Sequence, residues 1–362
     1  MRAVRTPSTS ASAAKIRFKE LLRKVGSGEH TSKGLSREES DEAFELMLTG
    51  QASDAQIGAF LIAHRIRRPE PQELTGMVDT YRRLGPSIQS ARGQARPLCF
   101  GMPFDGRKRT APIYPLTALI LLSAGQPVVF QAGGPMPVKY GVTAAELFEA
   151  LGLPLANLSL EQVQAGFDQH GFALIHQPTH FPLADQLIPH RDDLGKRPPI
   201  ASAELLWTAH RGDHLLISGF VHPPTESRAW EALALGGEHE VITVKGQEGG
   251  TDLPISRACI TGRIHQGRPA ERIILHPRDH GCFGADQEWT DLDTWQQQAE
   301  EALNNQGPLA PSLRWNAGAY LWMAGKASTL EAGLDAAERA MNEGQANAAL
   351  QALMAWRTSV GG

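Results

Sequence analysis

Apolar residues recur at helical spacing through the first part of the chain. The pattern predicts a helix over residues 15–25 and further helices that begin at the capping boxes Ser36-Arg-Glu-Glu39 and Ser53-Asp-Ala-Gln56 and at Pro71. In a capping box, the serine and the residue three positions later each satisfy a backbone N–H group that the helix leaves free. Together the four helices predict a compact helical unit of roughly 70 to 80 residues.

After Gly85-Pro86, short apolar runs typical of β-strands alternate with helical patterns. Such alternation predicts an α/β domain with a central, mostly parallel sheet flanked by helices. The expected strands are Leu98–Phe100, Pro127–Phe130, Leu174–His176, Leu215–Phe220 and Val241–Val244. The expected helices are Ala144–Leu151 and Ser159–His170, with most of 285–350 also helical.

A turn that opens on Gly101 follows the first expected strand and leads into an apolar helix from Ile113 to Ala124. A glycine turn at the end of a strand can direct backbone N–H groups at an anion, and three basic residues lie in the same turn. We therefore expect a phosphate-binding loop here, although a solvated basic loop is the alternative. Its candidate residues are Gly101, Asp105, Gly106, Arg107, Lys108, Arg109 and Thr110.

Composition is ordinary for a globular protein. The chain has 362 residues, 41% of them hydrophobic and 20% charged, and its longest apolar runs, such as Leu116–Leu122, are too short to span a bilayer. Cys99, Cys259 and Cys282 lack the spacing of a metal site, which favours a reducing, cytoplasmic location. The Ser/Ala-rich residues 1–14 favour a disordered tail over a transit peptide.

Charge is distributed unevenly along the chain. Residues 1–110 carry 19 Lys and Arg against 12 Asp and Glu, a net +7, whereas the remaining 252 residues carry 16 against 27, a net −11. A basic amino-terminal part on an acidic body predicts a localised anionic partner. Charge pairing between the two parts, within a domain or across a dimer, explains the pattern equally well.

Several segments, in order and over nearly the whole chain, resemble the anthranilate phosphoribosyltransferases. These segments are Leu35–Glu39, Gln51–Ile66, Glu146–Gly152 and Asn316–Lys326. The resemblance implies the fold shared by nucleoside phosphorylases and these transferases, and a homodimer formed through the helical domain. The expected helical domain comprises 1–88 with 144–200, and the expected phosphate-binding α/β domain comprises 89–143 with 201–362.

The resemblance also implies a donor site for phosphoribosyl diphosphate. Gly101, Asp105 and Gly106 match small and acidic positions of the family's first, glycine-rich loop, while residues 102–104 depart from it. Among those three, Pro103 lacks an N–H group and would remove a donor from a phosphate cradle. In the second loop only Gly133 matches the family, and the neighbouring Gly134 is a further candidate. Lys139, a few positions later, is the candidate for a replacement cation.

Metal and acceptor residues can be matched in the same way. The family binds magnesium through an adjacent Asp-Glu pair, and here Thr251 stands at the position of that Asp. Two carboxylates remain in the segment, Glu248 and Asp252, although they are not adjacent. Two carboxylates together with substrate phosphates suffice for Mg²⁺, and a solvated loop is the alternative. Arg191 lies in the segment whose arginine grips the carboxylate of the aromatic acid, and His176 corresponds to a family histidine.

A second, paralogous group of the family is a better match to Asp105–Pro112 and Pro115–Leu122. In that group the donor motifs are altered, and members have been associated with nucleic-acid binding in a basic groove of the dimer. Two functions follow: transfer of phosphoribose to an aromatic acid or amine, or non-catalytic nucleic-acid binding. In the second case Arg107, Lys108 and Arg109 are expected to contact phosphates through their side chains.

Overall fold

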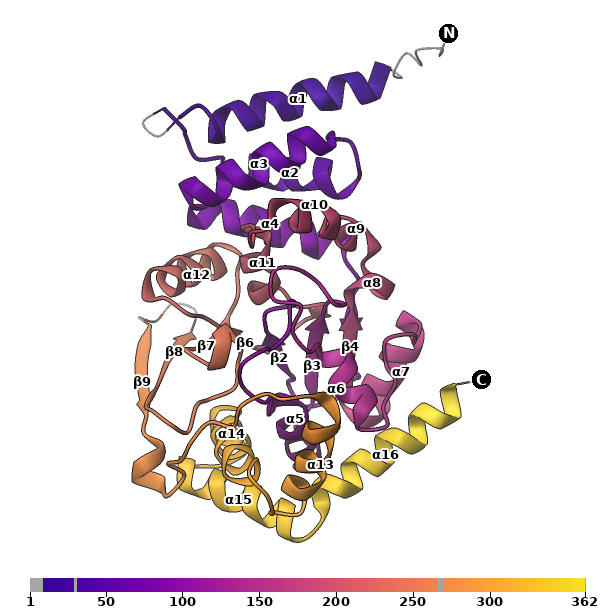
Figure 1. Cartoon of the computed structure of the whole chain (residues 1–362), viewed down its shortest axis with the longest axis vertical. Helices are drawn as coiled ribbons and strands as arrows, with labels where there is room; N and C mark the ends of the chain where they lie inside the picture. The colour runs from indigo at the N-terminus through magenta and orange to yellow at the C-terminus, as the bar shows by residue number, and fades with distance from the viewer. Residues whose placement is uncertain (1–8, 29–30, 266–267, 269, 362) are drawn as a thin grey trace.

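The computed structural model describes residues 9–28, 31–265, 268 and 270–361, and consists of a small helical part beside a larger α/β part (Figure 1). The first helices are α1 (Thr9–Val25), α2 (Arg37–Leu48), α3 (Asp54–Arg67) and α4 (Pro71–Leu84). Both predicted capping boxes, at Ser36 and Ser53, are confirmed. Of the tail expected over 1–14, the first eight residues lie outside the described residues, and the rest is helical from Thr9.

The helical part is held by aromatic packing and by one close helix crossing. Phe60 of α3 lies 5.4 Å from Phe18 of α1 and 6.1 Å from Phe44 of α2, measured between ring centroids. Gly76 of α4 lies directly against α2, since an added Cβ there would come within 2.4 Å of the Arg37 carbonyl oxygen. The absence of a side chain at this position therefore sets how closely α4 approaches α2.

The α/β part is built on a seven-stranded sheet with strand order β4-β3-β2-β6-β7-β8-β9. The strands are β2 (Leu98–Gly101), β3 (Val128–Ala132), β4 (Phe172–His176), β6 (Leu215–Gly219), β7 (Glu240–Val244), β8 (Cys259–His265) and β9 (Glu271–Leu275). The strands from β4 to β7 are parallel, as predicted, and their apolar residues form the buried centre. The sequence analysis missed β8 and β9, which add an antiparallel hairpin at one edge.

Helices cover the sheet and connect its strands (Figure 1). They are α5 (Tyr114–Ser123), α6 (Ala144–Ala150), α7 (Leu160–His170), α12 (Pro223–Leu235), α13 (Leu292–Leu303), α14 (Ala310–Met323), α15 (Leu330–Asn342) and α16 (Gln345–Val360). The apolar helix α5 packs against α14, α15 and α16, which buries nearly all of its side chains. A separate two-stranded sheet joins β1 (Ile88–Gln89) to β5 (His210–Arg211).

The domain boundary expected at residue 144 is corrected by the structure. Within 144–200, α6 and α7 cover the sheet, and β4 is its edge strand, paired with β3. Only the last part of this segment joins the helical part, where α10 packs on α3 and α11 packs on α4. The helices of this connection are α8 (Gln177–His180), α9 (Pro182–Asp185), α10 (Ile188–Leu194) and α11 (Ile200–Leu206).

The carboxyl ends of the parallel strands face the helical part (Figure 1). Loops that leave this edge of the sheet are where ligands bind in open α/β folds. The loop after β2, the connection after β4 and the loop after β7 all start there. Across the described residues, no helix combines the length and apolar character needed to cross a membrane.

Candidate functional site

Glycines allow the loop after β2 to follow its path. A Cβ at Gly101 would lie 2.0 Å from the Leu205 carbonyl oxygen, and one at Gly106, where φ is +77°, would lie 2.4 Å from the Gly141 carbonyl oxygen. The N–H group of Gly141 donates to the Asp105 carbonyl oxygen at 3.0 Å. The first expected phosphate loop is thus bound directly to the second one.

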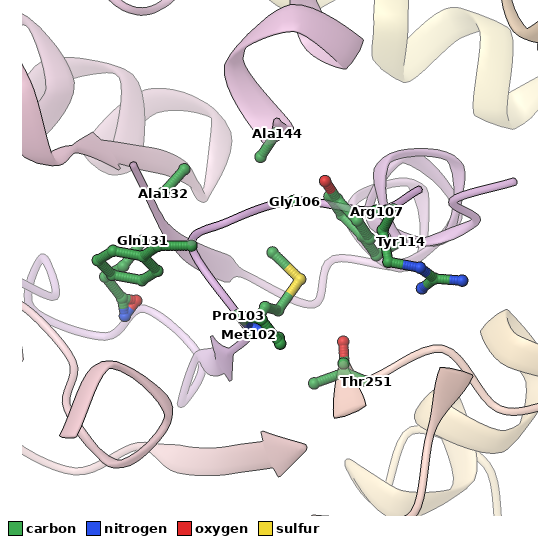
Figure 2. A pocket seen from close by; sticks show the side chains of 11 residues that line it. Met102, Pro103, Gly106, Arg107, Tyr114, Gln131, Ala132, Ala144 and Thr251 are labelled. Atoms are coloured by element: carbon green, nitrogen blue, oxygen red, sulfur yellow. The ribbon is translucent and has the colours of Figure 1, made fainter. Parts of the chain in front are cut away.

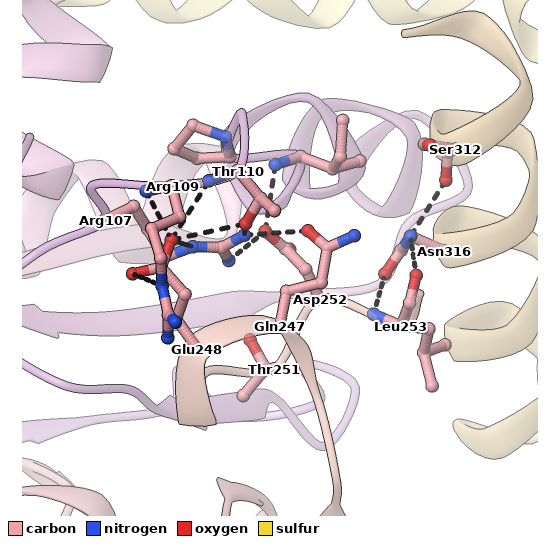
Figure 3. A network of polar contacts seen from close by, with 12 residues as sticks. Arg107, Arg109, Thr110, Gln247, Glu248, Thr251, Asp252, Leu253, Ser312 and Asn316 are labelled. Carbon is pink, nitrogen blue, oxygen red and sulfur yellow. Dashed lines mark hydrogen bonds and ion pairs between the residues drawn. The ribbon is translucent and has the colours of Figure 1, made fainter. Parts of the chain in front are cut away.

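Arg107 is buried within this loop and is fully engaged with neighbouring side chains (Figure 3). Its guanidinium donates to Asp252 Oδ2 at 2.8 Å and to Gln247 Oε1 at 2.7 Å, and it also donates to the Thr110 hydroxyl. Because its donors are used internally, this geometry gives no support to the expected contact between Arg107 and a ligand phosphate. In the basic triplet, Lys108 and Arg109 are the exposed members.

The carboxylate of Glu248 accepts hydrogen bonds from the backbone N–H groups of the loop (Figure 3). Its Oε1 accepts from the N–H groups of Arg109 at 2.8 Å, of Thr110 at 3.1 Å and of Lys108 at 3.3 Å. Burial acts to raise the pKa of Glu248, but the hydrogen bond from Arg109 and the charges of Arg107 and Lys139 outweigh it and hold the pKa at about 2. The anion-binding N–H groups predicted here exist, and a carboxylate of the chain fills them.

Asp252 completes a buried ion-pair network rather than a metal site. Its Oδ2 accepts from Arg107 and, at 3.0 Å, from the N–H of Ile113. Burial raises the pKa of Asp252 despite the neighbouring Arg107 charge. Because the Arg107 guanidinium lies 2.8 Å from Asp252 and 3.4 Å from Glu248, a cation already neutralises both carboxylates. The pair does not fit the Mg²⁺ site expected from the resemblance.

The cavity enclosed by the two loops is small and largely apolar (Figure 2). It holds about 20 Å³, room for roughly one water molecule, between Met102, Tyr114 and Gln131. The buried Met136 packs so closely on Gly133 that an added Cβ there would lie 2.0 Å from its Cε. The side chains of the loops thus fill the space in which a diphosphate was expected.

Lys139 lies where the two loops meet, as expected of a replacement cation. Its Nζ donates to the Gly106 carbonyl oxygen at 2.8 Å and lies 3.7 Å from Asp105 and 3.6 Å from Glu248. Burial lowers the pKa of Lys139 by more than the two neighbouring carboxylates raise it. Asp105 also pairs with Arg197, so the acidic position of the first loop lies beside two cations. Gly134, by contrast, lies against Pro178.

The two expected acceptor residues are not brought together in one cavity. Arg191 is buried and donates to Glu204 Oε1 at 2.8 Å, and it lines a cavity of about 180 Å³ that Glu248 also lines. Its Nε and Nη2 have no hydrogen-bond partner among the described residues. His176 is not among the residues that line this cavity, and its Nδ1 lies 3.0 Å from the Thr179 hydroxyl.

An open, strongly basic surface lies beside these closed loops. One cavity of about 460 Å³ is lined by the cations Lys108, Arg109, Lys139, Arg197, Lys245 and Arg257. A second, of about 610 Å³, is lined by Arg65, Arg68, Arg197 and Arg228. Arg197 lines both cavities, and we call the two together the basic groove. Among the described residues that line it, Glu248 is the one acid, and its carboxylate is already paired.

The basic groove joins the two parts of the molecule. Arg65 and Arg68 come from the end of α3, whereas Lys245 and Arg257 flank the loop after β7. The Arg65 guanidinium donates to the Arg197 carbonyl oxygen at 3.0 Å, and the Arg197 side chain pairs with Asp105 in the loop after β2, which connects the two parts. The sequence analysis did not assign these residues to a site, although the excess positive charge of the amino-terminal part was a signal for them.

Fold and site together define a two-domain protein of the glycosyl transferase type. The helical-bundle domain of the glycosyl transferase family matches residues 19–85, and the α/β domain of that family matches residues 107–347. The chain belongs to this family. The joint between the two matched domains is where the basic groove lies.

The chain is similar to anthranilate phosphoribosyltransferases along most of its length. The enzyme from Xanthomonas campestris is 26% identical over 323 residues, covering 87% of this chain and 92% of the relative. The enzyme from Symbiobacterium thermophilum is 27% identical over 350 residues, covering 92% and 96%.

Solved structures of such enzymes share the fold. The enzyme from Thermus thermophilus superposes with a TM-score of 0.74 at 23% identity, covering 93% of this chain and 99% of that one. The enzyme from Saccharomyces cerevisiae, solved in complex with PRPP and Mg, superposes with a TM-score of 0.79 at 13% identity, covering 95% and 99%.

Proposed function

We propose that the protein binds a nucleic-acid strand along the basic groove. The observation that carries this proposal is the lining of the groove, in which Lys and Arg side chains from both domains surround two adjacent open cavities. The exposed cations among them are Arg65, Arg68, Lys108, Arg109 and Arg257. Phosphate contacts by such side chains release condensed counterions and supply most of the affinity of non-specific binding. Few aromatic side chains line the groove, so phosphate contacts rather than base stacking are expected to dominate.

The test is the salt dependence of binding to single-stranded DNA and RNA, measured by fluorescence anisotropy. Replacing both Lys108 and Arg109 with alanine removes two exposed cations of the groove. For a single strand the salt slope should then fall by about 1.4, since each lost phosphate contact accounts for about 0.7. The affinity should fall for all sequences alike.

The matched control replaces Lys326 and Arg339 with alanine, which removes the same charge outside the groove. This variant should keep the affinity and the slope of the unaltered protein. Equal losses in the two variants would mean that overall charge, not the groove, holds the strand. No loss in either would rule out the proposal.

Phosphoribosyl transfer to an aromatic acid or amine is the second candidate. Family membership favours it, as does the cavity of about 180 Å³ in which Arg191 keeps two nitrogens without a partner. An aromatic carboxylate is a suitable ligand for such a guanidinium. Against it stand the filled cavity between the loops and the pairing of Glu248 and Asp252 with Arg107.

Calorimetric titration with phosphoribosyl diphosphate, with and without Mg²⁺, separates the two candidates. We expect no stoichiometric binding, because the loop N–H groups already hold Glu248. Mg²⁺-dependent binding would instead favour the transferase, and anthranilate would be the first acceptor to test. Nucleic-acid binding that phosphoribosyl diphosphate does not displace would support the first proposal.

We further propose a homodimer formed through the helical part, as the resemblance implies. Ile16 of α1 and Ile66 of α3 are large apolar side chains that are 60% and 74% exposed. Covering such side chains is a reason for two copies to associate. Light scattering should give the molar mass of two chains. Replacing both isoleucines with serine should lower the measured mass toward that of a single chain. An unchanged dimer would exclude this face as the interface.

A further inference from the structure

A cluster of one thiol and two imidazoles lies at the amino-terminal edge of the sheet, at the opposite end of the strands from the loops of the groove. Cys99 is in β2, His210 is in β5, and His214 directly precedes β6. One potential ligand atom from each residue lies within 4.8 Å of the other two. We propose that these three residues bind a Zn²⁺ ion, at a site that the proposed function does not require.

Hydrogen bonds orient both imidazole rings for this role. His210 Nε2 lies 2.9 Å from the Ser90 hydroxyl, and His214 Nδ1 lies 2.9 Å from the Gly212 carbonyl oxygen. Histidines that bind metals commonly use one nitrogen for the metal while the other is held by an oxygen. His210 Nδ1 then has no hydrogen bond with a described residue, and His214 Nε2 has only Glu238 beside it, at 3.1 Å, so we take these two nitrogens as the ligand atoms. The two rings stand nearly perpendicular, at 87°, with their centroids 5.6 Å apart.

His210 Nδ1 is a buried polar atom that needs a partner. The residue is 3% exposed, and this nitrogen has no hydrogen bond with any described residue. A buried, unpaired acceptor costs stability unless something binds it, and a metal ion would do so.

The ligand types favour zinc. Thiolate together with imidazole is a preferred ligand set for Zn²⁺, which binds such groups at about 2.0 to 2.3 Å in a tetrahedron. Ligand atoms are then about 3.5 Å apart, so the cluster must tighten by roughly 1 Å. The metal ligand is the thiolate, so formation of the Zn–S bond breaks the S–H bond of Cys99 and releases one proton to solvent.

A carboxylate stands beside the cluster. Glu238 Oε2 lies 3.1 Å from His214 Nε2, while the other oxygen of this carboxylate accepts from Arg82 of α4. Glu238 adds negative charge next to the ion and is the nearest candidate for a fourth ligand. The side chain of His214 is 10% exposed, which provides a route for the ion from solvent. Because α4 contributes Arg82, the ion would also stabilise the junction between the two domains.

The experiment titrates the reduced, chelator-treated full chain with Zn²⁺ in competition with a chromophoric chelator. We expect one Zn²⁺ per chain and a higher melting temperature with the ion than without it. Replacing Zn²⁺ with Co²⁺ should give the charge-transfer absorption of a cobalt–thiolate bond. Cys99→Ser should abolish this absorption and, like His210→Gln, weaken Zn²⁺ binding at least about 100-fold. The matched controls Cys259→Ser and Cys282→Ser remove the two other buried thiols and should change neither signal.

Binding of less than one equivalent of Zn²⁺, or unchanged binding in Cys99→Ser and His210→Gln, would overturn the proposal. If Cys99→Ser does not fold, His214→Ala replaces a partly exposed ligand and should show the same loss of Zn²⁺ affinity. At a temperature where the protein is fully folded with and without Zn²⁺, its affinity for nucleic acid should not depend on the ion. Failure of one proposal therefore leaves the other standing.

Discussion

Glu248 is the residue that distinguishes the loop after β2 from a phosphate-binding loop. Its backbone has φ +53°, which is unusual for a side chain other than glycine, and this conformation carries its carboxylate to the N–H groups of residues 108–110. A phosphate would need the same N–H groups. The sequence analysis matched Glu248 to a metal ligand because it could not foresee a pairing between residues about 140 positions apart.

The paired state of Glu248 makes stability depend on pH. The pKa of its carboxyl is held at about 2, below the ordinary 4.5, so its contribution is present above about pH 4.5 and is lost as the pH falls toward 2. Glu248→Gln should lower the free energy of unfolding by up to about 3 kcal/mol at pH 7. Urea unfolding should show this deficit shrink at pH 3.5. A deficit that is the same at both pH values would contradict the assignment.

Arg107 is expected to matter for folding rather than for ligand binding. Arg107→Ala leaves Asp252 buried without its cation, which should lower the free energy of unfolding by about 3 to 5 kcal/mol. Arg109→Ala is the matched control, since the Arg109 side chain is 80% exposed, and its effect should stay within about 0.5 kcal/mol. Chemical denaturation of both variants checks this. Equal stabilities would mean that the ion-pair network contributes nothing.

Elements with local signals are the ones that the sequence predicts well. The predicted capping boxes at Ser36 and Ser53 each depend on two residues three positions apart, and both are present. The hairpin of β8 and β9 has no comparable signal, because both of its strands are partly exposed and lack a long continuous apolar run. β4 was recognised as a strand, but its pairing with β3 depends on the tertiary fold and so its domain was misassigned.

Two glycines inside helices should respond in opposite ways to the same substitution. Gly58 of α3 has open space around it, so Gly58→Ala should stabilise the protein by about 0.5 to 1 kcal/mol through helix propensity. Gly76→Ala should destabilise it by about 1 to 3 kcal/mol, because the new methyl group meets the Arg37 carbonyl oxygen. Thermal unfolding of the two variants provides the comparison. Destabilisation by both would show that α3 is more tightly packed than described.

Across the whole molecule, the uneven charge of the sequence corresponds to two features. One is ion pairing between the basic amino-terminal part and the acidic remainder, as in Arg82 with Glu238 and Arg107 with Asp252, and the other is the basic groove. The net +7 of residues 1–110 includes Arg65, Arg68, Lys108 and Arg109, and the acidic remainder still contributes Arg197, Lys245 and Arg257 to the same surface. The sequence predicted an anionic partner but could not place these residues together. Their convergence depends on how the helical part sits against the loops of the sheet.

The loop that carries its own carboxylate should behave as a closed unit in exchange with solvent. The amide protons of Arg109 and Thr110 are directed at Glu248, so they should exchange slowly with deuterium in the ligand-free protein. Most surface loops exchange quickly until a ligand orders them. Here the two amide protons should be fully protected without any ligand, and added phosphate should not change their exchange rates. The reason is that the Glu248 carboxylate already serves as the anion bound by this loop.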